Sequence, residues 1–247
     1  MKKIISKKEF TRRRKNDAIR MSKNKTLKKN ALNLKIKAGH EYFWVHQTNW
    51  MNEPALQLPQ DLFAFQEIIY KTKPKYIIEI GVAWGGTLLF NSTILKLCGG
   101  KGIIGIDIFI PKSLRQRINK KIDKGIDLHL FNSSSLEPKT IEKVKKIIKN
   151  NSTMVILDSY HTHEHVKKEL DIYSKIVTKN CYIVCCDTII ELQPPVAKRP
   201  RPWKKGNSPM TAVKEFVREN NSFKIDKELE NKLLLSNMPS GYLKRVK

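Results

Sequence analysis

The sequence predicts an α/β protein with a doubly wound, mostly parallel sheet of seven strands, preceded by a basic N-terminal extension. From residue 60 onward, short apolar runs alternate with longer segments of helical spacing, which is the pattern of parallel strands joined by crossover helices. One apolar run, 76–80, leads into the glycine-containing turn 81–86 and then into an apolar helical stretch. A strand, a tight turn and a helix in this order form the ligand-binding corner of such sheets.

The remaining elements follow the chain in order. Pro74 and the pair Gly99-Gly100 mark helix ends, and the aromatic-rich stretch 38–59 has no clear period, which predicts irregular chain packed over the domain. The helices are expected at residues 60–72, about 87–97, 113–122, 137–149, 164–177 and 210–220. The strands are expected at residues 76–81, 103–106, 126–131, 154–157, 181–186, 232–236 and 241–246.

Charge divides the 247 residues into two parts. The net charge is +25, and residues 1–37 contain 15 Lys or Arg against Glu9 and Asp17, a net of +13. A segment this basic and this poor in aromatics does not bury enough surface to fold alone. We therefore expect residues 1–37 to form a flexible tail and residues 38–247 to form one domain. The tail suits a polyanionic partner, either nucleic acid or an anionic membrane surface, and a merely solubilising role stays open.

Neither a membrane span nor a secretory signal is apparent. No run reaches the ~18 apolar residues that cross a bilayer, and the basic N-terminus lacks an apolar core segment. The four cysteines include the adjacent pair Cys185-Cys186 in a strand-like run, which is typical of reduced, buried thiols. These features predict a cytoplasmic protein, with peripheral attachment to an anionic membrane surface as a further option.

Acidic residues recur at the ends of the expected strands. Glu79, Asp107, Asp158 and Asp187 lie at or near the carboxyl ends of four of them, and such ends meet at one edge of a parallel sheet. An acid in the position of Asp107 typically accepts hydrogen bonds from ribose hydroxyls. Two neighbouring carboxylates, Asp158 and Asp187, suit a hard cation such as Mg²⁺.

Polar groups beside these acids suggest further contacts. Ser134 lies in a polar turn that either presents hydrogen-bonding groups to an adenine edge or caps the helix expected at 137–149. His161 follows Asp158 by three residues, and a neutral imidazole there could accept a proton from a substrate hydroxyl. His161 and His165 also have the spacing of a zinc pair, and helix capping by the histidines is a third interpretation.

Several motifs follow one another over roughly residues 55–246. They are PQDLFAFQEIIYKTKPKYIIEIGVAWGGTLLF, IIGIDIFI, VILDSYHTHEHVKKELDIYSKIVTKNCYIVCCDTIIE, RPWKKGNSPMTAVKEF and KLLLSNMPSGYLKRV. In this order they resemble the cephalosporin hydroxylase–like and rhamnosyl O-methyltransferase family of class I S-adenosylmethionine-dependent methyltransferases.

The resemblance implies a Rossmann-like methyltransferase domain that binds S-adenosylmethionine over residues 81–86. The cofactor-binding residues implied by the motifs are Glu79, Gly81, Ala83, Gly85, Asp107, Ser134 and Asp158. Family members bind Mg²⁺ through an acid matching Asp158 and an acid pair after the fifth strand, but that pair is Cys186-Asp187 here, which puts the metal in doubt because a thiol is a poor Mg²⁺ ligand. The fold also resembles catechol O-methyltransferase, in which a lysine base has the spacing that His161 has here.

The resemblance further implies methyl transfer to a sugar hydroxyl of a cell-surface glycan or its precursor. Asp158 and His161 would carry the catalysis, and the acceptor would contact His163, Arg201, Trp203 and Lys205, with the indole stacking on a sugar face and the cations holding a phosphate or carboxylate. One alternative is an RNA methyltransferase, suggested by the charge, although the usual motif for exocyclic amines is absent. The other alternative is a non-catalytic binding module, suggested by Cys186.

Overall fold

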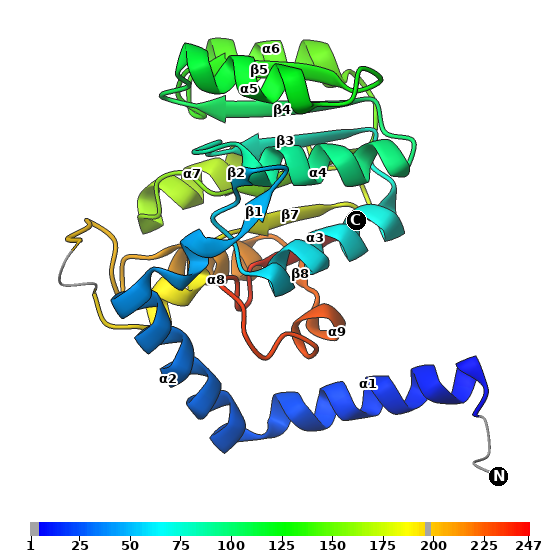
Figure 1. Cartoon of the computed structure of the whole chain (residues 1–247), viewed down its shortest axis with the longest axis vertical. Coiled ribbons are helices and arrows are strands. Elements are labelled where there is room, and N and C mark those ends of the chain that lie inside the picture. The colour runs from blue at the N-terminus through cyan, green and yellow to red at the C-terminus, as the bar shows by residue number, and fades with distance from the viewer. Residues whose placement is uncertain (1–4, 196–198) are drawn as a thin grey trace.

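A seven-stranded sheet organises the structure, as the sequence predicted (Figure 1). The computed structural model describes residues 5–195 and 199–247, so residues 1–4 of the expected tail and residues 196–198 lie outside the described residues. The strands of the sheet are β3 (Tyr76–Ile80), β4 (Gly102–Asp107), β5 (Asp127–Asn132), β6 (Thr153–Leu157), β7 (Tyr182–Cys185), β8 (Phe223–Ile225) and β9 (Tyr242–Arg245).

The strand order is β5-β4-β3-β6-β7-β9-β8, and β9 runs in the direction opposite to the other six strands. Strand β3 pairs with β4 on one side and with β6 on the other. The chain therefore reverses its direction of travel across the sheet at the carboxyl ends of these three strands. Ligands of open α/β sheets bind in the crevice at such a switch point.

Two layers of helices cover the sheet. On one face, residues such as Ile77 and Ile103 form a core with α3 (Pro59–Thr72), α4 (Gly86–Leu97) and α5 (Lys112–Lys121). On the other face, residues such as Ile78 and Ile104 form a core with α6 (Pro138–Ile148), α7 (His163–Tyr173) and α8 (Pro209–Glu219). Neighbouring residues of a strand point to opposite faces. The apolar runs of the sequence are continuous because both faces of the central strands are buried.

One predicted strand is wrong. Residues 232–236 form no strand, and the seventh strand of the sheet is β8 instead, with only Phe223 of its three residues fully buried. The helix α9 (Lys227–Glu230) follows β8, and residues 231–241 then cross the domain without regular structure. The leucines of 233–235 are half-buried in that crossing, so their apolar character reflects packing against other segments and not strand pairing.

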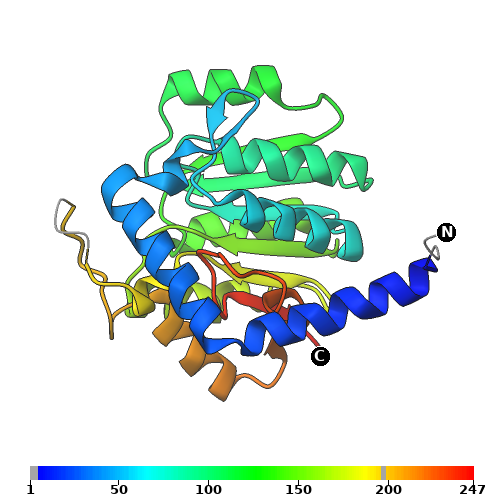
Figure 2. The ribbon, with the colours of Figure 1, turned by 60° about the horizontal axis from the view of Figure 1, so that its bottom comes forward.

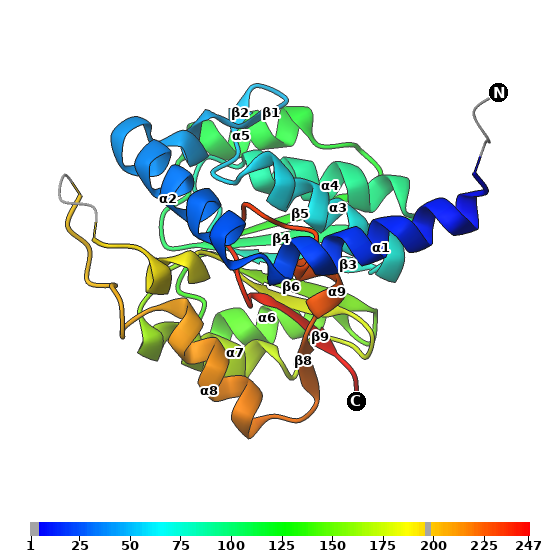
Figure 3. The same cartoon turned by 90° about the horizontal axis from the view of Figure 1, so that it is seen from below.

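The N-terminal segment is helical. Helix α1 (Lys7–Lys23) begins at Ser6, whose side chain accepts a hydrogen bond from the N–H of Glu9, and α2 (Lys25–Tyr42) begins at Asn24 in the same way. Helix α1 buries none of its residues and contacts the domain through an ion pair of Lys15 with Glu228 at 2.8 Å, and its N-terminal end projects from the domain (Figure 2 and Figure 3). Helix α2 buries Ala31 and Lys35. The expected division at residue 37 thus falls inside α2, and independent motion of residues 1–37 stays a prediction.

Short elements complete the chain. The stretch expected to be irregular contains the 3-10 turn η1 (Trp44–Gln47) and the hairpin of β1 (Asn49–Trp50) and β2 (Glu53–Pro54), and a second 3-10 turn, η2 (Thr188–Leu192), follows β7. Within residues 5–195 and 199–247, no helix combines the length and apolar character needed to cross a membrane.

A buried carboxylate ties the irregular C-terminal segment to α3. Asp61 is fully buried and accepts hydrogen bonds from the hydroxyls of Ser236 and Tyr242, at 2.6 and 2.8 Å, and from the N–H of Asn237 at 2.8 Å. Burial raises the pKa of Asp61. Because residues 231–241 have no regular hydrogen bonding of their own, this carboxylate is a main anchor for the segment.

We predict that Asp61→Ala lowers the free energy of unfolding by about 2–4 kcal/mol, because it leaves buried donors without an acceptor. Urea unfolding followed by circular dichroism measures the change. Glu67→Ala is the matched control, since Glu67 lies on the same helix but forms an exposed ion pair with Lys232, and it should cost at most about 1 kcal/mol. Equal losses in the two variants would contradict the anchoring role.

Candidate active site

Two adjoining cavities lie at the carboxyl edge of the sheet, on the side toward which the arrows of β3 and β4 point (Figure 1). They share Gly81, Ala83, Asp158 and Ser159. The first, which we name the glycine-turn cavity, has a volume of about 380 Å³ and is lined by Ile80, Gly81, Ala83, Ile106, Asp107, Ile108, Ser133, Ser134, Ser135, Asp158, Ser159, Tyr160 and His165. The second, the aromatic cleft, has a volume of about 350 Å³, and its lining includes Phe43, Trp44, His46, Trp84, Asp158, His161, Asp187, Arg199, Arg201 and Trp203.

Gly81 brings the ends of β3 and β6 into direct contact. Its φ angle is +92°, and a Cβ atom at this position would overlap the carbonyl oxygen of Asp158. Gly85 has a φ of +83° and starts α4. Gly81 and Ala83 of this turn line the glycine-turn cavity, whereas Gly85 lines neither cavity. The close approach of the turn to a ligand stays a prediction.

Asp107 at the end of β4 holds this turn in place. Its Oδ2 accepts hydrogen bonds from the N–H groups of Val82 (2.8 Å) and Ala83 (3.1 Å), and its Oδ1 accepts one from Phe109 (3.0 Å). The carboxylate also lines the glycine-turn cavity. It can therefore orient the turn and face a ligand hydroxyl at the same edge.

Serine hydroxyls form the opposite side of the cavity around a carboxylate that the sequence analysis missed. Glu169 of α7 is fully buried, and its Oε1 accepts hydrogen bonds from Ser135 (2.6 Å) and Ser159 (2.7 Å) and lies 3.1 Å from Nε2 of His165. Ser134 lines the cavity, and its hydroxyl accepts from the N–H of Leu136. The sequence did contain a signal for Glu169, because this acid falls among the apolar positions of the helix expected at 164–177.

Glu79 lies behind the cavities. Its carboxylate is buried and accepts a hydrogen bond from Nδ2 of Asn91 at 2.9 Å, and burial raises its pKa to about 8. Glu79 lines neither the glycine-turn cavity nor the aromatic cleft. The structure therefore brings Glu79 close to the turn without presenting it to a ligand.

Asp158, His161 and Asp187 form a cluster at the floor of the aromatic cleft. One ligand atom from each lies within 4.8 Å of the others, and Nε2 of His161 is 3.5 Å from Oδ2 of Asp187. Burial, and then the charge of Asp187, raises the pKa of Asp158, whereas burial lowers the pKa of His161. The cluster thus holds a neutral imidazole beside two carboxyl groups that repel each other unless a proton or cation lies between them.

Cys186 is not part of this cluster. Its side chain is fully buried in the core between the sheet and α3, and its Sγ lies 3.9 Å from Nε2 of Gln57. The same Gln57 nitrogen donates a hydrogen bond of 2.8 Å to Asp158. The third potential ligand is therefore His161. Gln57 is a contact that the sequence analysis missed, because it lies in the short connection between β2 and α3.

The cluster fits a divalent cation by its geometry. Its donors are two carboxylates and one imidazole, a set that Mn²⁺ and other transition metals accept more readily than Mg²⁺, which prefers oxygen. The residues that would hold a cation are Asp158, His161 and Asp187. The same His161 nitrogen cannot both hold a cation and accept a proton, so the two roles exclude each other.

The expected acceptor residues divide into two groups. Trp203 lies at the cleft with its ring centroid 4.9 Å from that of His161, and Arg201 lies over the Trp203 ring at 5.3 Å. His163 is directed elsewhere, because its ring bonds Thr211 (2.8 Å) and lies 3.2 Å from Glu215.

Lys205 is exposed and lines neither cavity. The structure therefore places Arg201 and Trp203 at the cleft but not His163 or Lys205. Four residues that were not predicted also line the aromatic cleft. They are Phe43 at the end of α2, Trp44 and His46 of η1, and Arg199.

Comparison with known proteins identifies the family of this chain. A family model described as "Rhamnosyl O-methyltransferase/CmcI" matches residues 42–246. The chain belongs to the rhamnosyl O-methyltransferase/CmcI family. This confirms the family, the Rossmann-like fold and the prediction of an S-adenosylmethionine-dependent O-methyltransferase.

Individual relatives agree with the family match. The rhamnosyl O-methyltransferase of Mycobacterium tuberculosis is 25% identical over 203 residues, which cover 81% of this chain and 78% of that protein. The enzyme of the same name from Mycobacterium leprae is 24% identical over 212 residues, covering 83% and 85%. A CmcI structure with Mg and SAM matches the fold with a TM-score of 0.57 and 18% identity over 82% of this chain and 78% of that chain.

We predict that Gly81→Ala weakens binding of S-adenosylmethionine by at least about tenfold, because the new methyl group displaces the carbonyl of Asp158 from the shared wall of the two cavities. Isothermal titration calorimetry measures the affinity. Gly99→Ala is the matched control, since Gly99 also has a positive φ but has open space around its missing Cβ. Wild-type affinity in Gly81→Ala would show that the cofactor binds elsewhere.

Proposed function

We propose that the protein transfers a methyl group from S-adenosylmethionine to a sugar hydroxyl of a cell-surface glycan or its precursor. The observation that carries this proposal is the position of the cluster Asp158, His161 and Asp187 beside the wall that the glycine-turn cavity and the aromatic cleft share. The names of the curated relatives support a sugar as the acceptor.

The glycine-turn cavity is the proposed site of the cofactor, whose bound form supplies a methyl group on a positively charged sulfur. The backbone of residues 81–85 would face its methionine part, and Asp107 would accept hydrogen bonds from its ribose hydroxyls. Ser134 and the hydroxyls oriented by Glu169 would face its adenine. This division places the reactive end of the cofactor toward Asp158, where the two cavities meet.

The aromatic cleft is the proposed site of the acceptor. Trp203, Phe43 and Trp44 offer ring faces on which a sugar can stack, and Arg199 and Arg201 offer cations for a phosphate or carboxylate on the acceptor. Such contacts hold the attacking hydroxyl in line with the methyl group, and positioning contributes much of the rate of a direct transfer.

His161 is the proposed proton acceptor for the attacking hydroxyl. Burial lowers its pKa, so the imidazole is neutral and able to accept a proton at neutral pH. If a divalent cation is used, His161, Asp158 and Asp187 would hold it, and the cation would acidify the hydroxyl directly. Cys186 would contribute to neither arrangement.

We predict that His161→Ala lowers the rate of methyl transfer about 10²–10⁴-fold while leaving the affinity for S-adenosylmethionine unchanged, because general base catalysis is typically of this size. The assay is a mass-spectrometric search for products heavier by one methylene group, with a panel of rhamnosides, other glycosides and RNA. His129→Ala, on β5 and outside both cavities, should retain activity. Methylation of RNA alone, or full activity of His161→Ala, would contradict the proposal.

Helix α1 is the proposed contact with an anionic membrane surface, which would give the protein a peripheral location. All residues from Arg12 to Arg14 are exposed, and Phe10 and Ile19 on the same helix are exposed as well. Basic side chains attract anionic lipids, and exposed apolar ones insert among the headgroups. Helix α1 buries none of its residues, and the side of the helix that does not carry the ion pair of Lys15 with Glu228 is proposed to make this contact.

We predict that replacing Arg12, Arg13 and Arg14 together by glutamine lowers the affinity for vesicles containing phosphatidylglycerol at least about tenfold, because each basic residue near the surface contributes ~1 kcal/mol. Co-sedimentation with the vesicles measures binding. The matched control replaces the exposed Lys143, Lys145 and Lys146 of α6 by glutamine, which removes the same charge from the opposite end of the molecule (Figure 1). Equal losses in the two variants would show that only total charge matters.

A further inference from the structure

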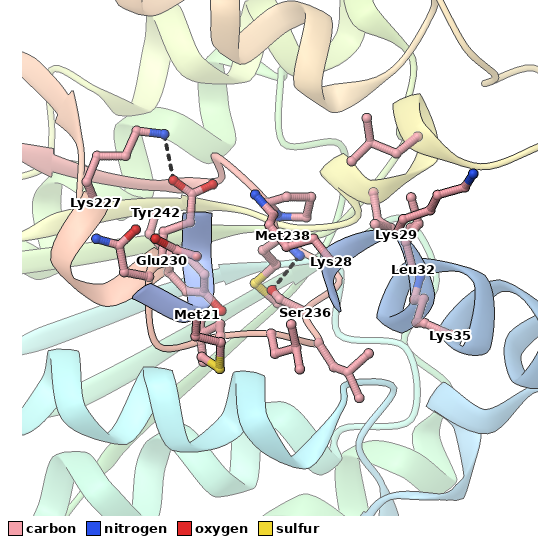
Figure 4. A pocket seen from close by; sticks show the side chains of 18 residues that line it. Met21, Lys28, Lys29, Leu32, Lys35, Lys227, Glu230, Ser236, Met238 and Tyr242 are labelled. Carbon is pink, nitrogen blue, oxygen red and sulfur yellow. Dashed lines mark hydrogen bonds and ion pairs between the residues drawn. The ribbon is translucent and has the colours of Figure 1, made fainter. Parts of the chain in front are cut away.

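A third cavity, of about 390 Å³, lies between α2 and the irregular C-terminal segment (Figure 4). We name it the leucine cavity. Its apolar lining includes Leu32 of α2, Ile189 of η2, and Leu233, Leu234, Leu235 and Met238 of the C-terminal segment. Its volume lies within the range of about 300–1,000 Å³ that is usual for small-molecule sites, and none of the residues proposed for methyl transfer lines it.

The apolar wall of this cavity is held in place by the surrounding fold. Leu233, Leu234 and Leu235 belong to no helix or strand, yet the following residues are fixed through Asp61. The three leucines are only half-buried. A fixed concave apolar surface that stays partly open to water is favourable for binding a hydrocarbon group.

Basic side chains line the α2 side of the same cavity. Lys28, Lys29 and Lys35 face it, and the one carboxylate in its lining, Glu230, is already engaged by Lys227 at 2.6 Å and by the N–H of Ser240 at 2.9 Å. Within the described residues, none of the three α2 lysines forms an ion pair, although the charges of Asp187 and Asp61 act on Lys35 and oppose the lowering of its pKa. The cavity thus combines an apolar wall with lysines that have no direct carboxylate partner in the described part of the chain.

Lys35 is the most unusual of these lysines. Only 8% of its surface is exposed, and its Nζ donates one long hydrogen bond, 3.4 Å, to Oε1 of Gln193. Burial lowers its pKa. A buried ammonium is costly unless an anion and further acceptors compensate it, so the side chain has the properties of a group that awaits an anionic ligand.

Lys35 also joins the leucine cavity to the proposed acceptor site. Both Lys35 and Ile189 line the aromatic cleft as well as the leucine cavity. A ligand whose anionic group lies at Lys35 can therefore extend an apolar chain in one direction and a polar group toward His161 in the other.

We propose that the leucine cavity binds the hydrocarbon chain of a long-chain alkyl or prenyl phosphate, with the phosphate at Lys35 and near Lys28 and Lys29. A phosphate offers several oxygens to a group of ammonium donors, with up to two charges as a monoester and one charge when it also bears a sugar. The acceptor sugar is then attached to this lipid phosphate and lies in the aromatic cleft. The position of the sugar rests on the proposed function, whereas the binding of the chain and phosphate does not.

The experiment is isothermal titration calorimetry of the full chain with dodecyl phosphate below its micellar concentration. Inorganic phosphate and dodecyl maltoside are titrated in parallel as the anion without a chain and the chain without an anion, and dodecanoate tests whether a carboxylate suffices. We expect saturable binding of one dodecyl phosphate per chain, at least about tenfold tighter than each of the other three, because both parts of the ligand contribute. Equal affinity for inorganic phosphate or for dodecyl maltoside would overturn the proposal, and equal affinity for dodecanoate would overturn the choice of phosphate.

Variants locate the binding. Lys35→Gln should weaken dodecyl phosphate binding at least about tenfold, since it removes a charged hydrogen-bond donor, while the exposed neighbour Lys37→Gln should bind as the wild type does. Leu32→Trp, which fills the cavity, should weaken dodecyl phosphate but not inorganic phosphate. Unchanged binding in both Lys35→Gln and Leu32→Trp would overturn the proposed location.

Titration of each variant with S-adenosylmethionine separates this proposal from the proposed function. It also reports whether the variant has kept its fold. Wild-type protein that binds dodecyl phosphate but not S-adenosylmethionine would support the lipid site and contradict the methyltransferase site. Wild-type protein that binds S-adenosylmethionine but not dodecyl phosphate would contradict the lipid site and leave the methyltransferase site supported.

Discussion

The close approach of Gly81 to Asp158 is the constraint on which the site depends. The N–H of Asp158 bonds the carbonyl of Ile80 at 2.7 Å, and the N–H of Gly81 bonds that of Ile106 at 2.8 Å, so three strands end at one level. A side chain on Gly81 would force β6 away from β3. Because Gly81 and Asp158 line both cavities, any ligand of the glycine turn lies next to the acidic cluster of the aromatic cleft.

The central part of the fold was predictable because its physical signal is local. Continuous apolar runs with both faces buried, such as 76–80, specify parallel central strands. Strand β8 was not predictable, since it has three residues and owes its position to pairing with β9. The apolar run 232–236 misled the prediction because packing against the core, as Leu233 does, gives the same signal as strand pairing. Helix α1 lacks any buried face, so its polar sequence gave only a weak indication of helix.

The site residues that lie at the ends of strands could be predicted from the sequence. Those that other segments bring to the site by packing could not. Asp158, His161 and Asp187 lie together because parallel strands end at one edge. His163, two residues from His161, turns toward α8 because the helix geometry directs it there. The contributions of Gln57 and Lys35 come from segments outside the sheet, and nothing in their local sequence indicates where those segments pack.

An experimental structure with bound S-adenosylhomocysteine would decide whether the cofactor and the acceptor meet at Asp158. We expect density for the adenosine between Asp107 and Ser134 in the glycine-turn cavity, with the sulfur directed toward the aromatic cleft and His161. Density in another cavity, or a sulfur directed away from Asp158, would contradict it.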